Sequence, residues 1–286
     1  MAKILVVGGT RFFGIPMVNA LIEAGHDVTI ATRGNAEILF VDKVRHIIVD
    51  RNNPEQVKEK LGGIYFDCTI DKVAYSSNDV KHLMDYVSCG RYILMSSCSV
   101  YTKFHSNIYE NEFDPFSYEL KWMDRIADYD EGKRQAECAA AQIYNRMPLT
   151  FVRYPVVMGP NDYTGRLKFY VDHIRKEIPM FIDDLNQRLS FIHEDEAGRF
   201  ISHLADYSVD GAVNGSSKGS ISISELISMI ENLTGKKAIF SENGDAAPYN
   251  GYMDDMTLNT DLADKTGFDF SNINSWIEDL IAYHVN

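Results

Sequence analysis

The sequence has few cysteines and no long apolar run. Its four cysteines are widely spaced and form no Cys-x-x-Cys pair; they are Cys68, Cys89, Cys98 and Cys138. This pattern gives no support for a metal or redox centre, and we expect buried free thiols in a reducing compartment. No apolar run approaches the roughly 20 residues of a membrane span, and the glycine-broken N-terminus does not read as a signal peptide. We therefore expect a cytoplasmic protein with no metal ion and no membrane partner.

Positive charge is also scarce. Lysine and arginine number 28 against 41 acidic residues, which gives a net charge of -13 over 286 residues. Because nucleic-acid binding needs concentrated basic residues, this balance argues against a nucleic-acid partner. It still permits a small anionic ligand in a local basic pocket. The length allows a large core in one large domain or two coupled domains.

The N-terminus reads as a strand, a glycine turn and a helix. The apolar run Ile4–Val7 predicts a strand buried on both faces, and it ends at Gly8. A helical pattern starts near Gly14 and stops at Gly25. Gly8 allows the tight turn, Gly14 allows close packing, and the helix N-terminus favours a pyrophosphate. The spacing is that of a dinucleotide-binding corner with Arg11 in the middle glycine's place, although an ordinary corner is the alternative.

The next two strand ends bear on cofactor choice. A strand at residues 27–31 leads to Arg33, where an acidic residue would select NAD by binding the ribose 2′-hydroxyl. Arg33, with Arg11 nearby, pairs better with a 2′-phosphate, so the sequence favours NADP. A solvated loop charge at Arg33 is the alternative. A third strand at residues 46–50 places Asp50 within reach of the adenine edge.

Strands and helices alternate through the first half of the chain. Helices are predicted at residues 54–61, 79–87 and 129–143, and strands at 65–71, 91–95 and 149–154. This order predicts an α/β, Rossmann-type fold with a doubly wound parallel sheet. We place a dinucleotide-binding domain at residues 1–155, with 189–210 packing back onto it. Residues 156–286 form a smaller C-terminal α/β substrate domain.

The polar and aromatic segment 102–128 has no clear periodicity. A segment this long is often a substrate loop or lid, but a packed excursion without a functional role fits equally well. Further along, His193 precedes the acidic run 194–196. We interpret that histidine as a helix cap or a packed residue and the acids as a first helical turn. A closing amphipathic helix at 273–283 is expected to pack in the core.

Tyr129 and Lys133 lie four residues apart at the start of a helix that follows the strand tip Ser96-Ser97. The spacing occurs by chance, but this context supports a shared site. A free tyrosine has a pKa near 10, and bringing it to about 7 takes roughly 4 kcal/mol. The Lys133 ammonium and a nicotinium cation would both lower that pKa. With Ser97 holding the substrate oxygen, these residues form a proton relay beside a hydride carrier.

Five motifs in order give the chain a wider resemblance. They are Gly8-Gly9-Thr10-x-Phe12-x-Gly14, Ser96-Ser97-x-x-Val100-Tyr101, Tyr129-x-x-Gly132-Lys133, Arg153-Tyr154-Pro155-x-x-x-Gly159-Pro160 and Phe191-Ile192-His193. Together they resemble the extended short-chain dehydrogenase/reductases, the NAD-dependent epimerase/dehydratase family, in its atypical Gly-Gly-Thr-Arg-Phe branch. The resemblance covers about residues 3–286.

The resemblance implies a catalytic triad. Tyr129 would be the general acid/base, Lys133 would bind the nicotinamide ribose and lower the tyrosine pKa, and Ser97 would orient the substrate. It implies NAD(P) as the cofactor, held by Gly8, Thr10, Arg11, Phe12, Phe13, Gly14, Arg33, Asp50, Lys133 and Tyr154.

The expected activity is oxidation or reduction, or epimerisation, at a secondary alcohol or ketone of a sugar or nucleotide sugar. Cys98-Ser99 replace the Asp-Glu pair of the dehydratases, so dehydration is disfavoured. Leu189 stands where nucleotide-sugar enzymes carry a diphosphate-binding arginine, with Arg188 one residue earlier. The alternative is a non-catalytic, nucleotide-sensing or RNA-associated member of the same fold. A homodimer through the helix after Tyr129 is a further possibility that the family suggests.

Overall fold

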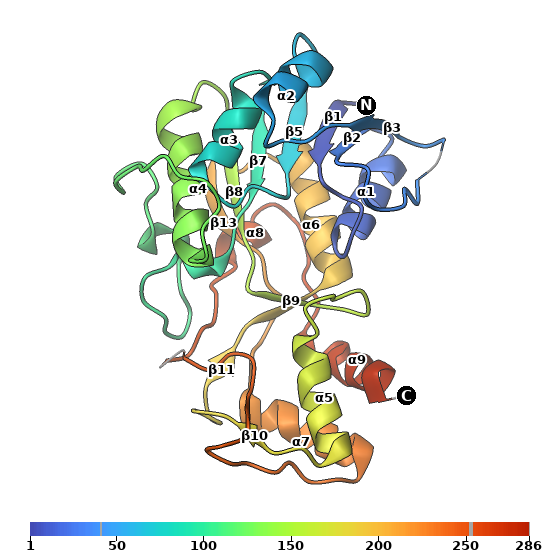
Figure 1. The fold of residues 1–286 in the computed structure, drawn as a ribbon, viewed down its shortest axis with the longest axis vertical. Helices are drawn as coiled ribbons and strands as arrows, with labels where there is room; N and C mark the ends of the chain where they lie inside the picture. The colour runs from blue at the N-terminus through green and yellow to red at the C-terminus, as the bar shows by residue number, and fades with distance from the viewer. Residues whose placement is uncertain (41, 252–253, 286) are drawn as a thin grey trace.

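The computed structural model describes residues 1–40, 42–251 and 254–285. Its centre is a sheet of seven strands in the order β3-β2-β1-β5-β7-β8-β13, with parallel pairing between neighbours (Figure 1). The strands are β1 (Lys3–Val7), β2 (Asp27–Thr32), β3 (Arg45–Ile48), β5 (Cys68–Asp71), β7 (Tyr92–Met95), β8 (Leu149–Arg153) and β13 (Gly211–Asn214). The predicted α/β class and parallel sheet are therefore confirmed.

Helices cover both faces of this sheet. Alternate residues of β1 point to opposite faces, so Ile4 and Val6 pack with one set of helices while Leu5 and Val7 pack with the other. The first set is α1 (Gly14–Glu23) and α6 (Glu194–Asp206). The second set is α2 (Pro54–Leu61), α3 (Ser77–Met84) and α4 (Tyr129–Ile143).

Glycines permit two close approaches near the first turn. Gly8 and Gly9 have φ values of +98° and +96°, which side-chain-bearing residues rarely adopt. A Cβ on Gly14 would lie 2.8 Å from the backbone of Gly9. Gly198 plays the same part for α6, because its Cβ would lie 2.6 Å from the amide nitrogen of Met17 on α1. The predicted role of Gly14 in close packing is confirmed by this geometry.

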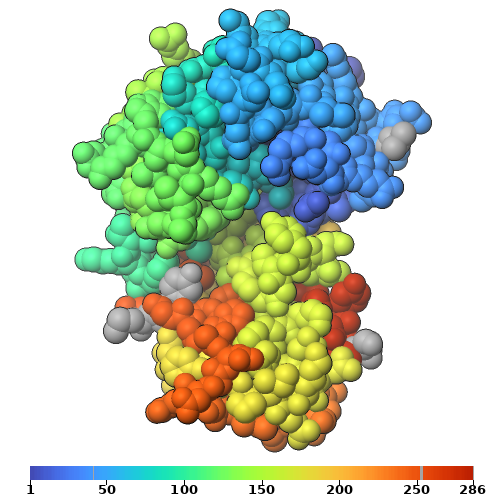
Figure 2. Space-filling model, viewed as in Figure 1, coloured from blue at the N-terminus to red at the C-terminus, as the bar shows by residue number. Residues whose placement is uncertain are grey.

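A second lobe hangs below the sheet. Helices α5 (Arg166–Lys176), α7 (Ile223–Thr234) and α9 (Ile277–Val285) pack against one another there (Figure 1). Figure 2 shows the outline narrowing between the two lobes. The short strands are β4 (Tyr65–Phe66), β6 (Ser88–Cys89), β9 (Val156–Met158), β10 (Met180–Phe181), β11 (Arg188–Leu189), β12 (Phe191–His193), β14 (Ile221–Ser222) and β15 (Asp245–Ala246). The remaining helical segments are α8 (Asp261–Asp264), η1 (Cys98–Val100), η2 (Glu110–Glu112) and η3 (Ile273–Ser275).

Several predicted elements differ at their ends. The strand expected at 65–71 is two strands, because β4 pairs with β6 while β5 enters the central sheet. The helix expected at 79–87 starts earlier, because the Ser76 side chain accepts a hydrogen bond from the Asp79 amide and caps it. The closing helix begins as the 3₁₀ turn η3, and the extended φ of −139° at Trp276 separates it from α9.

The segment 102–128 is anchored to the helices beside it. Gln142 on α4 donates to the carbonyl oxygens of Pro115 and Tyr118, at 2.8 and 2.7 Å. Ser77 on α3 donates to the carbonyl of Lys121 at 2.7 Å. The segment is therefore attached to α3 and α4 along its length, and Arg125 near its end lines the pocket described below.

The residues after β12 follow the predicted pattern in part. His193 is the N-cap of α6 and accepts a hydrogen bond from the Asp195 amide, as expected. Two of the three acids that follow are not solvated, however. Glu194 accepts hydrogen bonds from the backbone and side-chain amides of Asn161. Glu196 accepts one from the Ser217 hydroxyl at 2.6 Å and one from the Ser271 amide at 2.5 Å. These two carboxylates connect the segments around Asn161 and Ser217 to the start of α6, and they also interact favourably with its helix dipole.

All four cysteines are free and buried. Within the described ranges, no three histidine, cysteine or acidic side chains gather in a way that could hold a metal ion. Nor does any helix there combine the length and apolarity that crossing a bilayer requires.

Candidate active site

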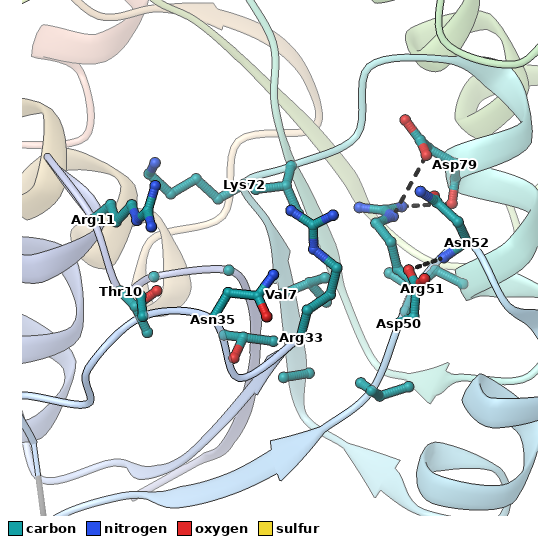
Figure 3. A pocket seen from close by; sticks show the side chains of 18 of the residues that line it. Val7, Thr10, Arg11, Arg33, Asn35, Asp50, Arg51, Asn52, Lys72 and Asp79 are labelled. Carbon is teal, nitrogen blue, oxygen red and sulfur yellow. Dashed lines mark hydrogen bonds and ion pairs between the residues drawn. The ribbon is translucent and has the colours of Figure 1, made fainter. Parts of the chain in front are cut away.

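A cavity of about 570 Å³ lies at the carboxyl ends of the central strands (Figure 3). This is the edge of a parallel sheet at which ligands bind. Among the residues predicted to hold a cofactor, those that line it are Gly8, Thr10, Arg11, Arg33 and Asp50. Each comes from the end of β1, β2 or β3, so the strand-end reasoning places them correctly around one cavity.

The other predicted cofactor residues do not line this cavity with their side chains. The Phe12 and Phe13 rings are buried and pack edge-to-face at 5.4 Å. Tyr154 is buried under Phe13 and donates its hydroxyl to the carbonyl of Ala197 at 2.6 Å. Gly14 is packed against Gly9. Lys133 is fully buried behind the cavity and belongs to the candidate relay described below. Tyr154 is thus a core residue in this structure.

The cavity is rich in cations without counter-charges. Arg11, Arg33 and Arg125 are exposed, and Lys72 is 9% exposed. None of these four, hereafter the pocket cations, forms an ion pair with a carboxylate in the part of the chain that the structure describes. In a protein of net charge -13, four such side chains around one cavity indicate an anionic ligand.

Arg51 lines the same cavity but pairs with carboxylates, although its Nε forms no hydrogen bond with any described residue. Its guanidinium donates to the Asp71 carboxylate at 2.5 Å and lies 3.8 Å from a carboxylate oxygen of Asp79. Tyr92 donates to the second Asp71 oxygen at 2.9 Å. These partners raise the pKa of Arg51 despite burial. Sequence reasoning missed this group, since Asp71 was marked only as a strand end and nothing linked it to an arginine 20 residues earlier.

The turn between β1 and α1 is suited to phosphate. The N-cap residue Phe13 supplies no side-chain cap, and no described residue accepts a hydrogen bond from the backbone amides of Arg11, Phe12 or Phe13. Free amides at a helix N-terminus bind phosphate groups through hydrogen bonds and the helix dipole. The positive-φ glycines, the free amides and the pocket cations together fit a dinucleotide.

The predicted relay residues come together at the edge of this region. Asp128 caps α4 by accepting from the Glu131 amide at 3.0 Å, so the helix begins at Tyr129. Ser97 caps η1, and its side chain lies near enough to Tyr129 to lower the pKa of that phenol. The Lys133 ammonium lies 5.7 Å from the centre of the Tyr129 ring. One helix turn and one strand end therefore place the three residues in the same region of the structure.

The electrostatics of the pair differ from the sequence-based expectation. Tyr129 as a whole is 42% exposed. Desolvation of its hydroxyl raises its pKa, and the nearby Tyr75 adds to this, although Ser97 acts in the opposite direction. Burial also lowers the pKa of Lys133 to about 7. Lys133 is fully buried and donates to the carbonyls of Ala74 and Met95, both at 2.8 Å. Because Lys133 is only partly charged near pH 7, it lowers the pKa of the Tyr129 phenol little. The pKa of Tyr129 is therefore raised by burial, whereas the sequence predicted that it would be lowered.

Tyr75 joins the relay to the cofactor cavity, and sequence reasoning missed it. Its ring lies 4.5 Å from the Lys133 ammonium and 6.1 Å from the Tyr129 ring. Arg125, from the end of the 102–128 segment, stacks on the same ring at 4.2 Å. A tyrosine just before a helix gives no local signal for this position, because the contacts come from three separate segments.

Arg188 is committed elsewhere. Its guanidinium donates to the carbonyl of Ser220 at 2.5 Å and pairs with Glu225 at 3.1 Å, while Leu189 is fully buried. The arginine that nucleotide-sugar enzymes use at this position therefore has no direct substitute here. Successive residues of a strand point to opposite sides, so Arg188 faces away from the side that Leu189 occupies.

Known proteins with similar sequences support this assignment of the fold. One relative is the chloroplast stem-loop binding protein of 41 kDa b of Arabidopsis thaliana, 32% identical over 115 residues, which are 35% of this chain and 30% of that protein. Another is a UDP-glucuronate 4-epimerase of Thermodesulfobacterium geofontis, 30% identical over 138 residues, which are 46% of this chain and 43% of that protein. The matches thus span less than half of the length of either relative.

Solved structures extend the likeness over the whole fold. The UDP-glucose 4-epimerase of Thermus thermophilus, in complex with NAD, superposes with a TM-score of 0.70 at 14% identity, covering 98% of each chain. A model of the NAD dependent epimerase/dehydratase family matches residues 4–216, which include the glycine turn, the strand-end serines, and Tyr129 and Lys133. With its sheet order, its phosphate-binding turn and this match, the chain belongs to the NAD-dependent epimerase/dehydratase family.

Proposed function

We propose that the chain is an NAD(P)-dependent enzyme that oxidises, reduces or epimerises a secondary alcohol or ketone of a sugar or nucleotide sugar. The observation that carries this is the meeting of Ser97, Tyr129 and Lys133 beside a dinucleotide-sized cavity with unpaired cations. Membership of the family and the two nucleotide-sugar epimerases among the similar proteins support the substrate class.

The proton chemistry falls to this chain's own residues. When bound, the nicotinamide supplies the acceptor or donor of hydride. Tyr129 removes the proton of the substrate hydroxyl or returns it, and Ser97 holds the substrate oxygen in line. Burial of its hydroxyl raises the pKa of Tyr129, so the phenol keeps its proton unless a positively charged group lies beside it. Lys133, whose pKa is lowered to about 7, supplies that charge once it is protonated.

NADP is the favoured cofactor in this proposal. Arg11 and Arg33 line the cavity at the tips of β1 and β2 and have no carboxylate partner among the residues described. An arginine pair at this place suits the doubly charged 2′-phosphate, whereas NAD leaves both cations unmatched. Asp50, which also lines the cavity, is proposed to bind the adenine or ribose edge.

The substrate is proposed to enter between the lobes. We propose a cofactor domain of residues 1–155 with 189–210 and a substrate domain of 156–286, from which β13 returns to the central sheet. Since Arg188 is held by Ser220 and Glu225, any nucleotide diphosphate must be bound by other residues. Cys98-Ser99 after the serine disfavour a dehydratase, which leaves an epimerase or a simple reductase.

Replacement of Tyr129 tests this function. Tyr129→Phe removes the transferable proton and is expected to lower kcat about 10²- to 10⁴-fold with cofactor affinity kept. The substrates are a panel of UDP-sugars and free sugars, assayed with NADPH and NADH. Tyr207→Phe, an exposed tyrosine at the end of α6, is the matched control and should keep full activity. Full turnover in Tyr129→Phe contradicts the proposed mechanism.

A second candidate comes from the stem-loop binding relative. A non-catalytic, nucleotide-sensing or RNA-associated protein would bind a dinucleotide without turnover on any sugar, and RNA binding would weaken with salt. The net charge of -13 and the complete relay favour the enzyme. A homodimer through α4 and a cytoplasmic location remain predictions; light scattering of the purified protein tests the former.

A further inference from the structure

Lys72 is a buried lysine that directly follows β5. It has no role in the proposed proton transfer by Ser97, Tyr129 and Lys133. Its side chain is 9% exposed and lines the cofactor cavity. The ammonium lies 4.0 Å from the centre of the Phe13 ring. Figure 3 shows the side chain running toward the turn that carries Thr10 and Arg11. Lys72 thus reaches the start of α1 from the opposite wall of the cavity.

The surroundings of this ammonium are unfavourable for a cation. Phe13 is the N-cap of α1, so the charge lies at the positive end of a helix dipole, where cations are destabilised. No described carboxylate pairs with Lys72. The Phe13 ring face is the one attraction that the contacts reveal, and such a contact supplies only about 0.5–2 kcal/mol. An anion between the Lys72 ammonium and the free amides of the turn would satisfy both sides.

We propose that Lys72 binds the diphosphate group of the dinucleotide, opposite the backbone amides of the turn at the start of α1. The inference rests on the proposed cofactor binding and adds a residue that the family motifs quoted above do not contain. The glycine turn contacts the diphosphate with neutral donors, and Lys72 adds a charge-assisted donor on the other side. Arg11 and Arg33 then remain available for the 2′-phosphate.

Binding of the dinucleotide should be accompanied by proton uptake at Lys72. Burial lowers the pKa of Lys72 to about 8, so near pH 8 the empty site holds about half a proton there. A diphosphate beside the amine favours its charged form and should draw a proton from solution. The other charged residues that line the cavity are Arg11, Arg33, Asp50, Arg51, Asp79 and Arg125. Lys133, on α4, is coupled to Lys72 from outside this lining.

Lys72 also acts on the relay. Its charge is one of the causes that lower the pKa of Lys133. Pairing of Lys72 with a diphosphate would weaken that repulsion, so Lys133 would hold its proton more readily with cofactor bound. Binding of the dinucleotide would in this way prepare the ammonium that stabilises the Tyr129 phenolate.

Titration calorimetry with NADPH and NADH at pH 8, in buffers of different ionisation enthalpy, tests the inference. The native protein should take up about half a proton or more on binding. Lys72→Met should bind about 10- to 100-fold more weakly and lose most of that uptake. Lys72→Arg keeps a permanent charge, so it should retain affinity but lose the uptake. Because Lys133 also titrates near this pH, Lys133→Met serves as reference and should keep the Lys72 component.

The outcomes separate the two proposals. Unchanged affinity and uptake in Lys72→Met, with the native protein binding the dinucleotide, would overturn the role of Lys72 and leave the proposed function intact. Failure of the native protein to bind either dinucleotide would overturn both. If Lys72→Met unfolds, Lys72→Arg decides alone: retention of the full proton uptake in that variant excludes Lys72 as its source.

Discussion

Two groups of basic side chains lie on the same sheet and have opposite surroundings. The pocket cations at the ends of β1, β2 and β5 and of the 102–128 segment have no carboxylate partner among the described residues. Arg153, at the end of β8, is fully buried, and all three of its guanidinium nitrogens are used. Arg51, paired with Asp71 and Asp79, resembles Arg153 although it lines the cavity.

The Arg153 group is a closed network. Its guanidinium forms two hydrogen bonds to the Glu137 carboxylate, at 3.0 and 2.7 Å, and donates to the carbonyls of Glu110 and Phe113. Ser96, next to the candidate catalytic serine, donates to the same carboxylate at 2.5 Å. Arg153 thus fixes α4 and the strand end that carry the relay, and it has no capacity left for a ligand.

The difference shows that partners decide whether a charged residue builds the scaffold or serves a ligand. A buried charge without a partner is costly, and one with a partner is structural. The pocket cations avoid that cost by exposure, except for Lys72, whose lowered pKa reduces its charge instead. An anionic ligand that pairs with these cations would gain an electrostatic attraction that no described carboxylate supplies.

Removal of Arg153 should have the largest effect on stability. Arg153→Met leaves the Glu137 carboxylate buried without its counter-charge and should cost about 3–5 kcal/mol of unfolding free energy. Thermal unfolding should show a melting temperature lower by roughly 10 °C. Arg33→Met, which removes a pocket cation, is the control and should shift it by no more than about 2 °C. Equal shifts in the two variants would erase the distinction between the groups.

Lys133 is an intermediate case, since it has carbonyl partners but no carboxylate, and it should make stability depend on pH. The folded-state pKa of about 7 lies below the unfolded value of 10.5, so the unfolded chain binds more protons between these limits. Stability of the native protein should therefore rise with pH in this window. Relative to Lys133→Met, it should gain about 2 kcal/mol between pH 7.5 and 9.5.

Urea unfolding of both proteins at the two pH values measures this gain. Both are measured with Lys72→Arg added, because Lys72 and Lys133 repel each other and removal of Lys133 alone would also shift the titration of Lys72. Parallel pH profiles for the native protein and Lys133→Met would mean that burial does not lower the pKa of Lys133.

Arg33 should show the smallest effect on stability and a selective effect on binding. Arg33→Leu should weaken NADPH binding about 10- to 100-fold and leave NADH binding within about threefold, because only NADPH carries the 2′-phosphate. Fluorescence titration with both nucleotides measures the ratio. Arg175→Leu, an exposed arginine on α5, is the matched control. Equal losses for both nucleotides would contradict the NADP preference.

Local sequence patterns predicted the elements that carry the candidate site, which the structure confirms. The glycine spacing, the apolar run before it and the helix after it predicted the phosphate turn, since backbone freedom and burial on both faces leave direct traces in the sequence. Tyr129 and Lys133 were found because helical spacing and the position at the start of a helix are local properties. The split of β4 from β5 was not predicted, because it depends on which strands they pair with. The end of η3 was not predicted either, because packing in the second lobe determines it.

The sequence by itself determined the parallel α/β architecture and the order of the chemical groups along the strand ends, because period, turn residues and spacing act over a few neighbours. Only the tertiary structure decided which charges are paired. Arg51 pairs with Asp71 and Arg153 pairs with Glu137, whereas Lys72 pairs with no acid among the residues that the structure describes. No local pattern in the sequence distinguishes these three basic residues. The protonation states of Lys133 and Tyr129 follow from the same cause, because burial depends on segments that meet only when the chain is folded.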